Sequence, residues 1–186
     1  MKHRLLSGLT ALALSLTACG GGGGGGGDIG LPIGGGSGGG SGNWNIRIVD
    51  FRTNNANLQV GSSATLSWQV DYSDPTGTGY YVEIFAYNNP SVPPAPVETG
   101  LYRIFQLNCG PTFVALGGGC DKTGSAYCEV QTSMGVPTIL CRVPNSSASP
   151  QSKTLLVSGG GYLVMRACTG LFLDVCDVKA INANFP

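Results

Sequence analysis

The stretch Thr65-Leu66-Ser67-Trp68-Gln69-Val70-Asp71 alternates apolar and polar side chains. On an extended chain, successive side chains point to opposite faces, so Leu66, Trp68 and Val70 share one face. The remaining residues of the stretch form a polar face. This period of two predicts a β-strand that packs one side against a hydrophobic core.

The same period recurs through the rest of the chain from residue 44 onward. Turn-forming residues separate the runs, as in Asp74-Pro75-Thr76-Gly77 and Gly159-Gly160-Gly161. The predicted strands are 44–51, 65–71, 80–87, 101–107, 127–131, 138–143, 153–157, 162–168 and 171–181. No apolar helical stripe runs for more than two turns. Short strands at this spacing predict one all-β antiparallel sandwich over residues 43–186.

Two stretches resemble strands of fibronectin type III and immunoglobulin-like domains. VGSSATLSWQV (60–70) resembles their second strand, with Trp68 as the core aromatic residue. TLLVSGGGYLVMRACTG (154–170) resembles their fifth strand, the following turn and the sixth strand. A proline-rich loop at 89–97 and a cysteine-bearing hairpin insertion at roughly 108–145 depart from that pattern. The resemblance implies a single fibronectin- or immunoglobulin-like sandwich that carries a disulfide-bearing hairpin insertion.

The N-terminus has the composition of an export signal. Lys2, His3 and Arg4 form a basic start, and residues 5–16 form an apolar stretch of twelve residues. A membrane-spanning helix needs about 20 apolar residues, so this stretch is too short to span and suits a signal peptide. We therefore expect residues 1–18 to be removed.

The signal ends in Leu16-Thr17-Ala18-Cys19, which resembles the lipobox of bacterial lipoproteins. The resemblance implies cleavage before Cys19 and attachment of two or three acyl chains to this residue, which hold a protein firmly in a membrane. In that family an Asp after the cysteine favours retention at the inner membrane. Gly20 stands there in this chain, which implies an outer-membrane location.

A glycine-rich segment separates Cys19 from the predicted strands. Sixteen of the 23 residues in 20–42 are glycine. Ordering glycine costs the most backbone entropy, and few apolar residues are present to offset that cost. Residues 19–42 therefore predict a flexible tether, with an average end-to-end distance of roughly 25 to 30 Å.

Six cysteines remain after Cys19, an even number that predicts disulfides in an exported chain. If Met134-Gly135 is a two-residue hairpin turn, Cys128 faces Cys141 at a non-hydrogen-bonded position. Cα atoms lie about 4.5 Å apart at such positions, which suits a disulfide. The same register puts Pro137 where its missing N–H costs no hydrogen bond between the strands. The register therefore predicts a Cys128–Cys141 disulfide.

The other two pairs follow from position in the chain. Cys168 and Cys176 flank the connection between the last two predicted strands, so we pair them across it. Cys109 then remains for Cys120. The spacings contain neither C-x-x-C nor the paired short separations of metal ligands, which favours structural disulfides.

Charge and histidine content exclude several functions. Ten Lys and Arg balance ten Asp and Glu, so we expect no basic surface for nucleic acid. The one histidine, His3, lies in the predicted signal, which leaves the processed chain without a Ser-His-Asp or Cys-His nucleophile and without His-bound zinc or haem. We therefore expect no catalytic residue and no cofactor.

Asp71 and Asp74 are the weak candidates for metal binding. They lie in DYSDPTGTG (71–79), an oxygen-rich segment of a kind that suits Ca²⁺. Aspartates before Pro-Thr-Gly also form turns for purely local reasons, and the full twelve-residue calcium loop is not matched. The turn is therefore the favoured interpretation, with no metal.

The candidate binding surface comprises Tyr81, Phe85, Tyr87, Asn88 and Asn89, because tyrosine and asparagine are typical of recognition surfaces. Alternation puts the three aromatic residues on the face away from the core. There they are either exposed or packed against the hairpin insertion, and packing is the favoured alternative.

We expect an envelope lipoprotein that displays its sandwich as a binding or assembly module. Its partners would be the membrane, through the lipid anchor, and an envelope protein or glycan. One alternative is a carboxylate-dependent envelope enzyme such as a glycan hydrolase, which two acids about 5 to 10 Å apart in a cleft would support. Another is a structural accessory subunit of an envelope complex, which a large exposed apolar patch would support.

Overall fold

The computed structural model describes residues 45–74, 77–90, 100–117, 119–169 and 175–186. The predicted signal peptide, Cys19 and the tether lie outside these ranges. The described residues include nine strands and the short helix α2: β1 (Asn45–Thr53), β2 (Ser63–Ser73), β3 (Tyr80–Tyr87), β4 (Arg103–Cys109), α2 (Pro111–Ala115), β5 (Thr123–Ser133), β6 (Val136–Arg142), β7 (Gln151–Thr154), β8 (Gly159–Thr169) and β9 (Cys176–Phe185). Residues 100–102, before β4, are also helical. Within these ranges, every helix is too short to cross a membrane.

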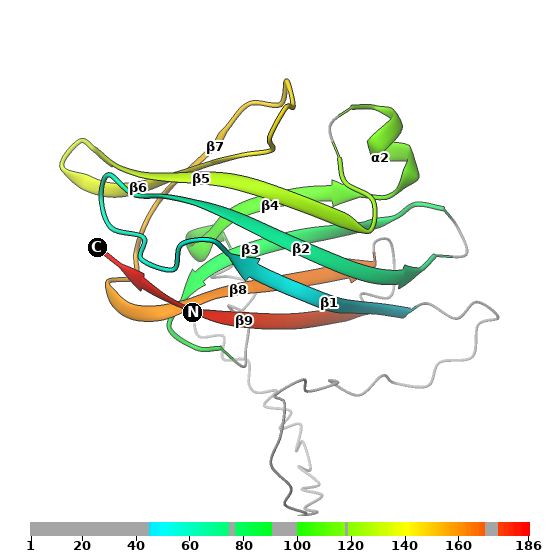
Figure 1. Cartoon of the computed structure of the whole chain (residues 1–186), viewed down its shortest axis with the longest axis horizontal. Coiled ribbons are helices and arrows are strands. Elements are labelled where there is room, and N and C mark those ends of the chain that lie inside the picture. Colours follow the sequence, from blue (N-terminus) through cyan, green and yellow to red (C-terminus); the bar gives the residue numbers. More distant parts are fainter. Residues whose placement is uncertain (1–44, 75–76, 91–99, 118, 170–174) are drawn as a thin grey trace, which may run out of the picture.

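The strands form two antiparallel sheets that lie as two layers (Figure 1). One sheet has the order β1-β2-β5-β6-β7 and the other has the order β4-β3-β8-β9. Buried apolar side chains from both sheets belong to one cluster. This architecture agrees with the predicted all-β sandwich.

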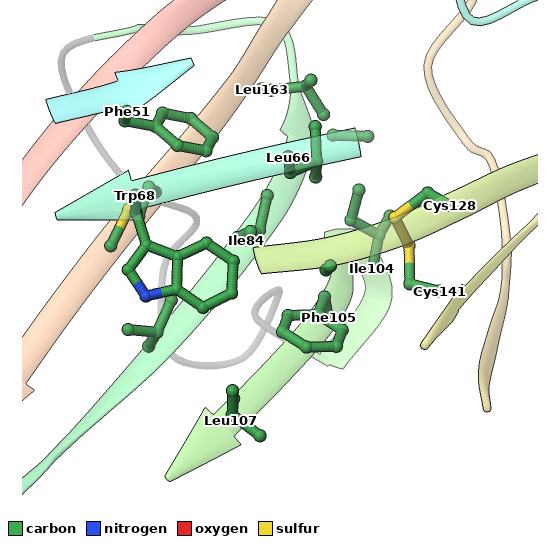
Figure 2. Close-up of a cluster of buried hydrophobic side chains, with 14 of the residues drawn as sticks. Phe51, Leu66, Trp68, Ile84, Ile104, Phe105, Leu107, Cys128, Cys141 and Leu163 are labelled. Carbon is green, nitrogen blue, oxygen red and sulfur yellow. A yellow bond between two sulfur atoms is a disulfide. The ribbon is translucent and has the colours of Figure 1, made fainter. Parts of the chain in front are cut away.

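Trp68 lies at the centre of the core, where it is 2% exposed (Figure 2). Its indole centroid lies 6.1 Å from that of Phe105 in the facing sheet. Across the strand pair, Trp68 is opposite Gly124, and a Cβ atom on Gly124 would lie 2.4 Å from the indole. Glycine is needed here because any larger residue would displace the tryptophan.

The β5–β6 hairpin has the register that the sequence predicts. Met134 and Gly135 both have positive φ, at 51° and 82°, and Ser133 pairs with Val136. Cys128 therefore pairs with Cys141, and their Cα atoms are 4.1 Å apart. Positive φ at both central residues matches the twist of an antiparallel pair, which explains why two residues suffice for this turn.

The described residues contain three disulfides, and they join the three pairs expected from the sequence. Besides Cys128–Cys141, they are Cys168–Cys176, which links the paired strands β8 and β9, and Cys109–Cys120. The last of these ties the end of β4 to the segment that precedes β5, so it connects elements of the two sheets.

The sequence placed the fifth strand wrongly. The stretch from Thr154 is expected to resemble a fifth strand, whereas the strand found there, β7 (Gln151–Thr154), ends at Thr154, lies at the edge of its sheet and pairs with β6. The neighbours of β2 are β1 and β5, and since β5 belongs to the expected insertion, the insertion is built into the sheet. Ala126, Cys128 and Val130 on β5 are buried, whereas most of β7 is exposed, so only β5 has the apolar face that this central place requires.

The C-terminal end of the last strand also differs from the expected bound. β9 continues to Phe185 rather than stopping at residue 181, because Ala183 and Phe185 add buried side chains to the core. The expected start at 171 falls outside the described residues.

Side chains join the two sheets along the seam between β1 and β9. The Ile48 backbone N–H donates to Asp177 Oδ2 at 2.6 Å, and Lys179 Nζ donates to the Val49 carbonyl oxygen at 3.1 Å. β1 is the edge strand of its sheet, with β2 on its other side, and its register shifts between Ile48 and Asp50. The Asp177 carboxylate and the Lys179 ammonium group thus bind backbone groups of an edge strand, as a neighbouring strand would do.

A single glutamine joins the sheets along the opposite seam, between β4 and β7. The Gln106 backbone N–H donates to Gln151 Oε1 at 2.9 Å, and Gln151 Nε2 donates to the Gln106 carbonyl oxygen at 2.7 Å. An amide side chain presents one donor and one acceptor, as a backbone peptide group does. Gln151 therefore pairs with β4 as an adjacent strand would.

Candidate functional site

The five residues of the candidate binding surface do not form one surface. Phe85 is fully buried, and the guanidinium carbon of Arg166 lies 5.4 Å from its ring centroid. Tyr87 is half-buried, with its ring centroid 4.9 Å from that of Tyr102. Asn88 and Asn89 are exposed beyond the end of β3. Phe85 is therefore packed rather than exposed, in line with the favoured alternative, and Arg166 of β8 in the same sheet lies against its ring.

Tyr81, by contrast, lines a cavity at the end of the sandwich that carries α2. It lies opposite Asn108 on β4. Figure 1 shows α2 beyond the end of β4, at the same end as the start of β1, while the β5–β6 turn lies at the opposite end. We call this group of elements the α2 end.

The loop closed by Cys109–Cys120 dominates the α2 end. Its helix begins at Pro111, which suits a first helical position because the missing N–H has no helical partner there. None of the five residues of α2 is buried. Val114 is 49% exposed and Leu116, directly after the helix, is 77% exposed. The loop therefore presents large apolar side chains to solvent.

Phe113 is the half-buried aromatic residue of this loop. A Cβ atom on Gly119 would lie 2.3 Å from Phe113 Cβ and 2.7 Å from the Asn108 carbonyl oxygen, so only glycine permits this close approach. The Gly119 N–H donates to the Phe113 carbonyl oxygen at 3.2 Å. The loop thus folds back on itself and holds Phe113 in place.

Two cavities lie at the α2 end, with volumes of about 400 Å³ and about 450 Å³, and Phe113 and Asn108 line both. The smaller one is also lined by Gln106, Leu107, Leu116 and Gln151. The larger one is also lined by Gly77, Thr78, Gly79, Tyr80, Tyr81 and Thr112. No charged side chain lines either cavity among the described residues. We call the two cavities together the Phe113 site.

A pair of tyrosines packs next to the Phe113 site, and one of them, Tyr80, lines its larger cavity. The Tyr72 and Tyr80 ring centroids are 4.7 Å apart. The Tyr72 hydroxyl donates to Asp121 Oδ1 at 3.0 Å, and the Tyr80 hydroxyl donates to the Asp121 carbonyl oxygen. Burial, together with the Asp121 hydrogen bond and charge, raises the pKa of Tyr72 to about 12, and burial also raises the pKa of Tyr80.

These tyrosines predict a loss of stability at high pH. The folded state keeps the Tyr72 proton above the ordinary pKa of 10.0, so its contribution is complete below pH 10 and is lost as the pH rises to about 12. The free energy of unfolding, measured with urea at each pH, should fall over this interval. The fall should be smaller in Tyr72→Phe, which cannot ionise. An equally steep fall in that variant would contradict the assignment to Tyr72.

Asp71 and Asp74 both have structural partners. Asp71 forms an exposed ion pair with Arg47 at 3.7 Å. Asp74 Oδ2 accepts a hydrogen bond from the Gly79 N–H, and the Asp74 carbonyl oxygen accepts one from Gly77. These contacts are those of a turn. Within the described residues, no group of three or more His, Cys, Asp or Glu side chains is placed to hold a metal ion.

The four-stranded sheet also carries a buried ion cluster. The Glu83 side chain is 4% exposed and pairs with Arg103 at 2.6 Å. On its other side it accepts a hydrogen bond from Arg166 Nε at 2.9 Å and another from Nη2. Sequence alternation had placed Glu83 on a face away from the core, and it gave no sign that two arginines from β4 and β8 would enclose it.

Sequence reasoning missed the Phe113 site. A local signal was present, because PTFVALG (111–117) combines a helix-starting proline, apolar residues and a terminating glycine between two paired cysteines.

Compared with known protein families, curated proteins and solved structures, the chain matches none of them.

Proposed function

We propose that this protein is a lipid-anchored envelope module that binds a partner through its α2 end. The observation that carries this proposal is the exposure of Val114 and Leu116 on a disulfide-closed loop beside the Phe113 site. Exposed apolar side chains next to a cavity are typical of interaction sites. A disulfide at the base of the loop limits the entropy lost on binding.

The strand order supports a fibronectin- or immunoglobulin-like classification of the module. In immunoglobulin-type sandwiches the first, second and fifth strands share one sheet, and the third, sixth and seventh share the other. Here β1, β2 and β5 are consecutive in one sheet, and β3, β8 and β9 are consecutive in the other. β6 and β7 then extend the first sheet beyond its usual edge. Loops at the ends of such sandwiches are the usual binding elements.

The proposal predicts that a polar substitution at Leu116 weakens partner capture. Full-length tagged protein, solubilised from membranes in detergent, is used to recover envelope components, and Leu116→Ser is compared with the wild type. We expect at least a tenfold lower yield of one component, which corresponds to a loss of about 1.4 kcal/mol and is the effect of removing one of the few dominant contacts of an interface.

Met134→Ser is the matched control, because Met134 is fully exposed at the opposite end of the sandwich. It should bind as the wild type does. Equal loss in both variants would indicate general stickiness, and no loss in Leu116→Ser would refute binding through the α2 end.

The anchor is supported by the lipobox resemblance and makes a separate prediction. Cys19→Ser should leave the precursor unprocessed and abolish labelling with radioactive palmitate, because the substitution removes the sulfur that accepts the diacylglycerol. Electrophoresis of membrane fractions measures both effects. Normal labelling of Cys19→Ser would disprove the anchor, whatever the outcome for Leu116.

A further inference from the structure

We propose that the Phe113 site binds a neutral oligosaccharide. This inference rests on the proposed function, since it names the ligand class of the same end of the molecule.

The absence of charge from the lining selects a neutral ligand. Among the described residues, the lining contains no Lys, Arg, Asp or Glu. The nearby acids are engaged elsewhere, Asp121 with Tyr72 and Asp74 with the backbone of its own turn. A charged ligand placed here would lose part of its hydration and gain no counter-charge. Anionic and cationic ligands are therefore disfavoured.

The mixture of ring faces and hydrogen-bonding groups then selects a sugar over a lipid chain. Tyr81 and Phe113 supply aromatic surface, and Asn108 and Thr112 supply amide and hydroxyl groups. A sugar ring has an apolar C–H face and a rim of hydroxyl groups, so it can use both kinds of contact. An acyl chain would cover the polar groups and leave them without partners.

The shared walls indicate a ligand longer than one ring. Phe113 and Asn108 separate the two cavities and belong to both, so a chain of sugars can lie across them. Each volume falls within the range of small-molecule sites, about 300 to 1,000 Å³. The smaller cavity is also lined by the amide side chains of Gln106 and Gln151.

Contacts within the protein hold the side chains of the site in place without a ligand. Gln151 is fixed by its two hydrogen bonds to the Gln106 backbone, and Phe113 by its contact with Gly119. The Cys109–Cys120 disulfide closes the loop that carries Phe113. Little conformational entropy is therefore lost on binding, which suits a ligand with many weak contacts.

The test titrates full-length protein, purified from membranes in detergent, with defined tetrasaccharides followed by isothermal calorimetry. The neutral probes are chitotetraose, cellotetraose and maltotetraose, and tetragalacturonate is the acidic comparator. We expect at least one neutral probe to bind and the acidic one to bind at least tenfold more weakly. Phe113→Ala and Asn108→Ala should each weaken neutral binding at least tenfold, while Met134→Ala should not.

Asn108→Ala keeps the test decisive if Phe113→Ala disturbs its loop, because the Asn108 side chain is exposed. Failure of all three neutral probes, equal binding of the acidic probe, or unchanged binding in Asn108→Ala would each overturn the inference. These results are independent of the Leu116→Ser capture experiment. Capture that depends on Leu116 without sugar binding would leave the proposed function standing and remove only the ligand class.

Discussion

Replacing Trp68 with alanine should lower the free energy of unfolding by about 3 to 5 kcal/mol, the usual loss for a buried tryptophan. Trp68 is 2% exposed, packs against Phe105 and covers Gly124, so its removal leaves a cavity between the two sheets. The surrounding strands are joined by disulfides and hydrogen bonds, and they cannot collapse far into that space. Urea denaturation followed by circular dichroism measures the change.

Trp68→Phe should lose less stability than Trp68→Ala. Within the described residues, the buried Trp68 Nε1 has no hydrogen-bond partner, and phenylalanine removes this unsatisfied N–H while keeping an aromatic ring. Met134→Ala is the control for truncation at a fully exposed position, where the change should stay within about 0.5 kcal/mol. A loss in Trp68→Ala as small as that of Met134→Ala would show that Trp68 does not anchor the core.

Removing Glu83 should cost about 3 kcal/mol, the lower end of the range for breaking a buried ion pair. The lower end applies because Arg103 and Arg166 keep 34% and 20% of their side chains exposed, whereas Glu83 keeps 4%. Glu83→Ala leaves two arginines side by side with no carboxylate between them. Their mutual repulsion and lost hydrogen bonds both lower the free energy of unfolding, measured by urea denaturation.

Two comparisons separate this effect from a simple loss of charge. Asp71→Ala breaks the exposed pair with Arg47, whose side chains are 54% and 69% exposed, and should cost less than about 1 kcal/mol. The triple variant Glu83→Leu, Arg103→Met, Arg166→Met should recover most of the loss, because an apolar cluster of similar volume replaces the ions. Equal losses for Glu83→Ala and Asp71→Ala would contradict a special role for the buried cluster.

The sequence predicted local structure well because local structure depends on near neighbours. Alternation located most strands of the described residues, although the predicted strand 153–157 shares only two residues with β7 (Gln151–Thr154). A two-residue turn determined the Cys128–Cys141 register, which joins residues thirteen positions apart. Sheet order depends instead on which strands bury the most apolar area together. Nothing within residues 151–157 revealed that β5 would take the place beside β2.

The candidate site was predicted only in part for the same reason. Tyr81 was recognised as a recognition-type residue, but the cavity around it needs Phe113 from a helix 30 residues further along the chain, after a second strand. Phe85 has the same alternation as Tyr81 and is nevertheless fully buried, with the Arg166 guanidinium carbon 5.4 Å from its ring centroid. Period-two alternation assigns a side chain to a face, and only the tertiary structure determines what lies against that face.

The side chains along the two seams have a consequence for proteins concentrated in two dimensions. Molecules confined to a bilayer collide often and in a shared orientation, conditions under which unpaired strand backbones of neighbouring copies join into continuous sheets. Asp177 and Lys179 occupy backbone groups on one flank, and the Gln151 amide does so on the other. If the protein is held on a membrane as proposed, these contacts leave fewer backbone groups on the two flanks for pairing with neighbouring copies.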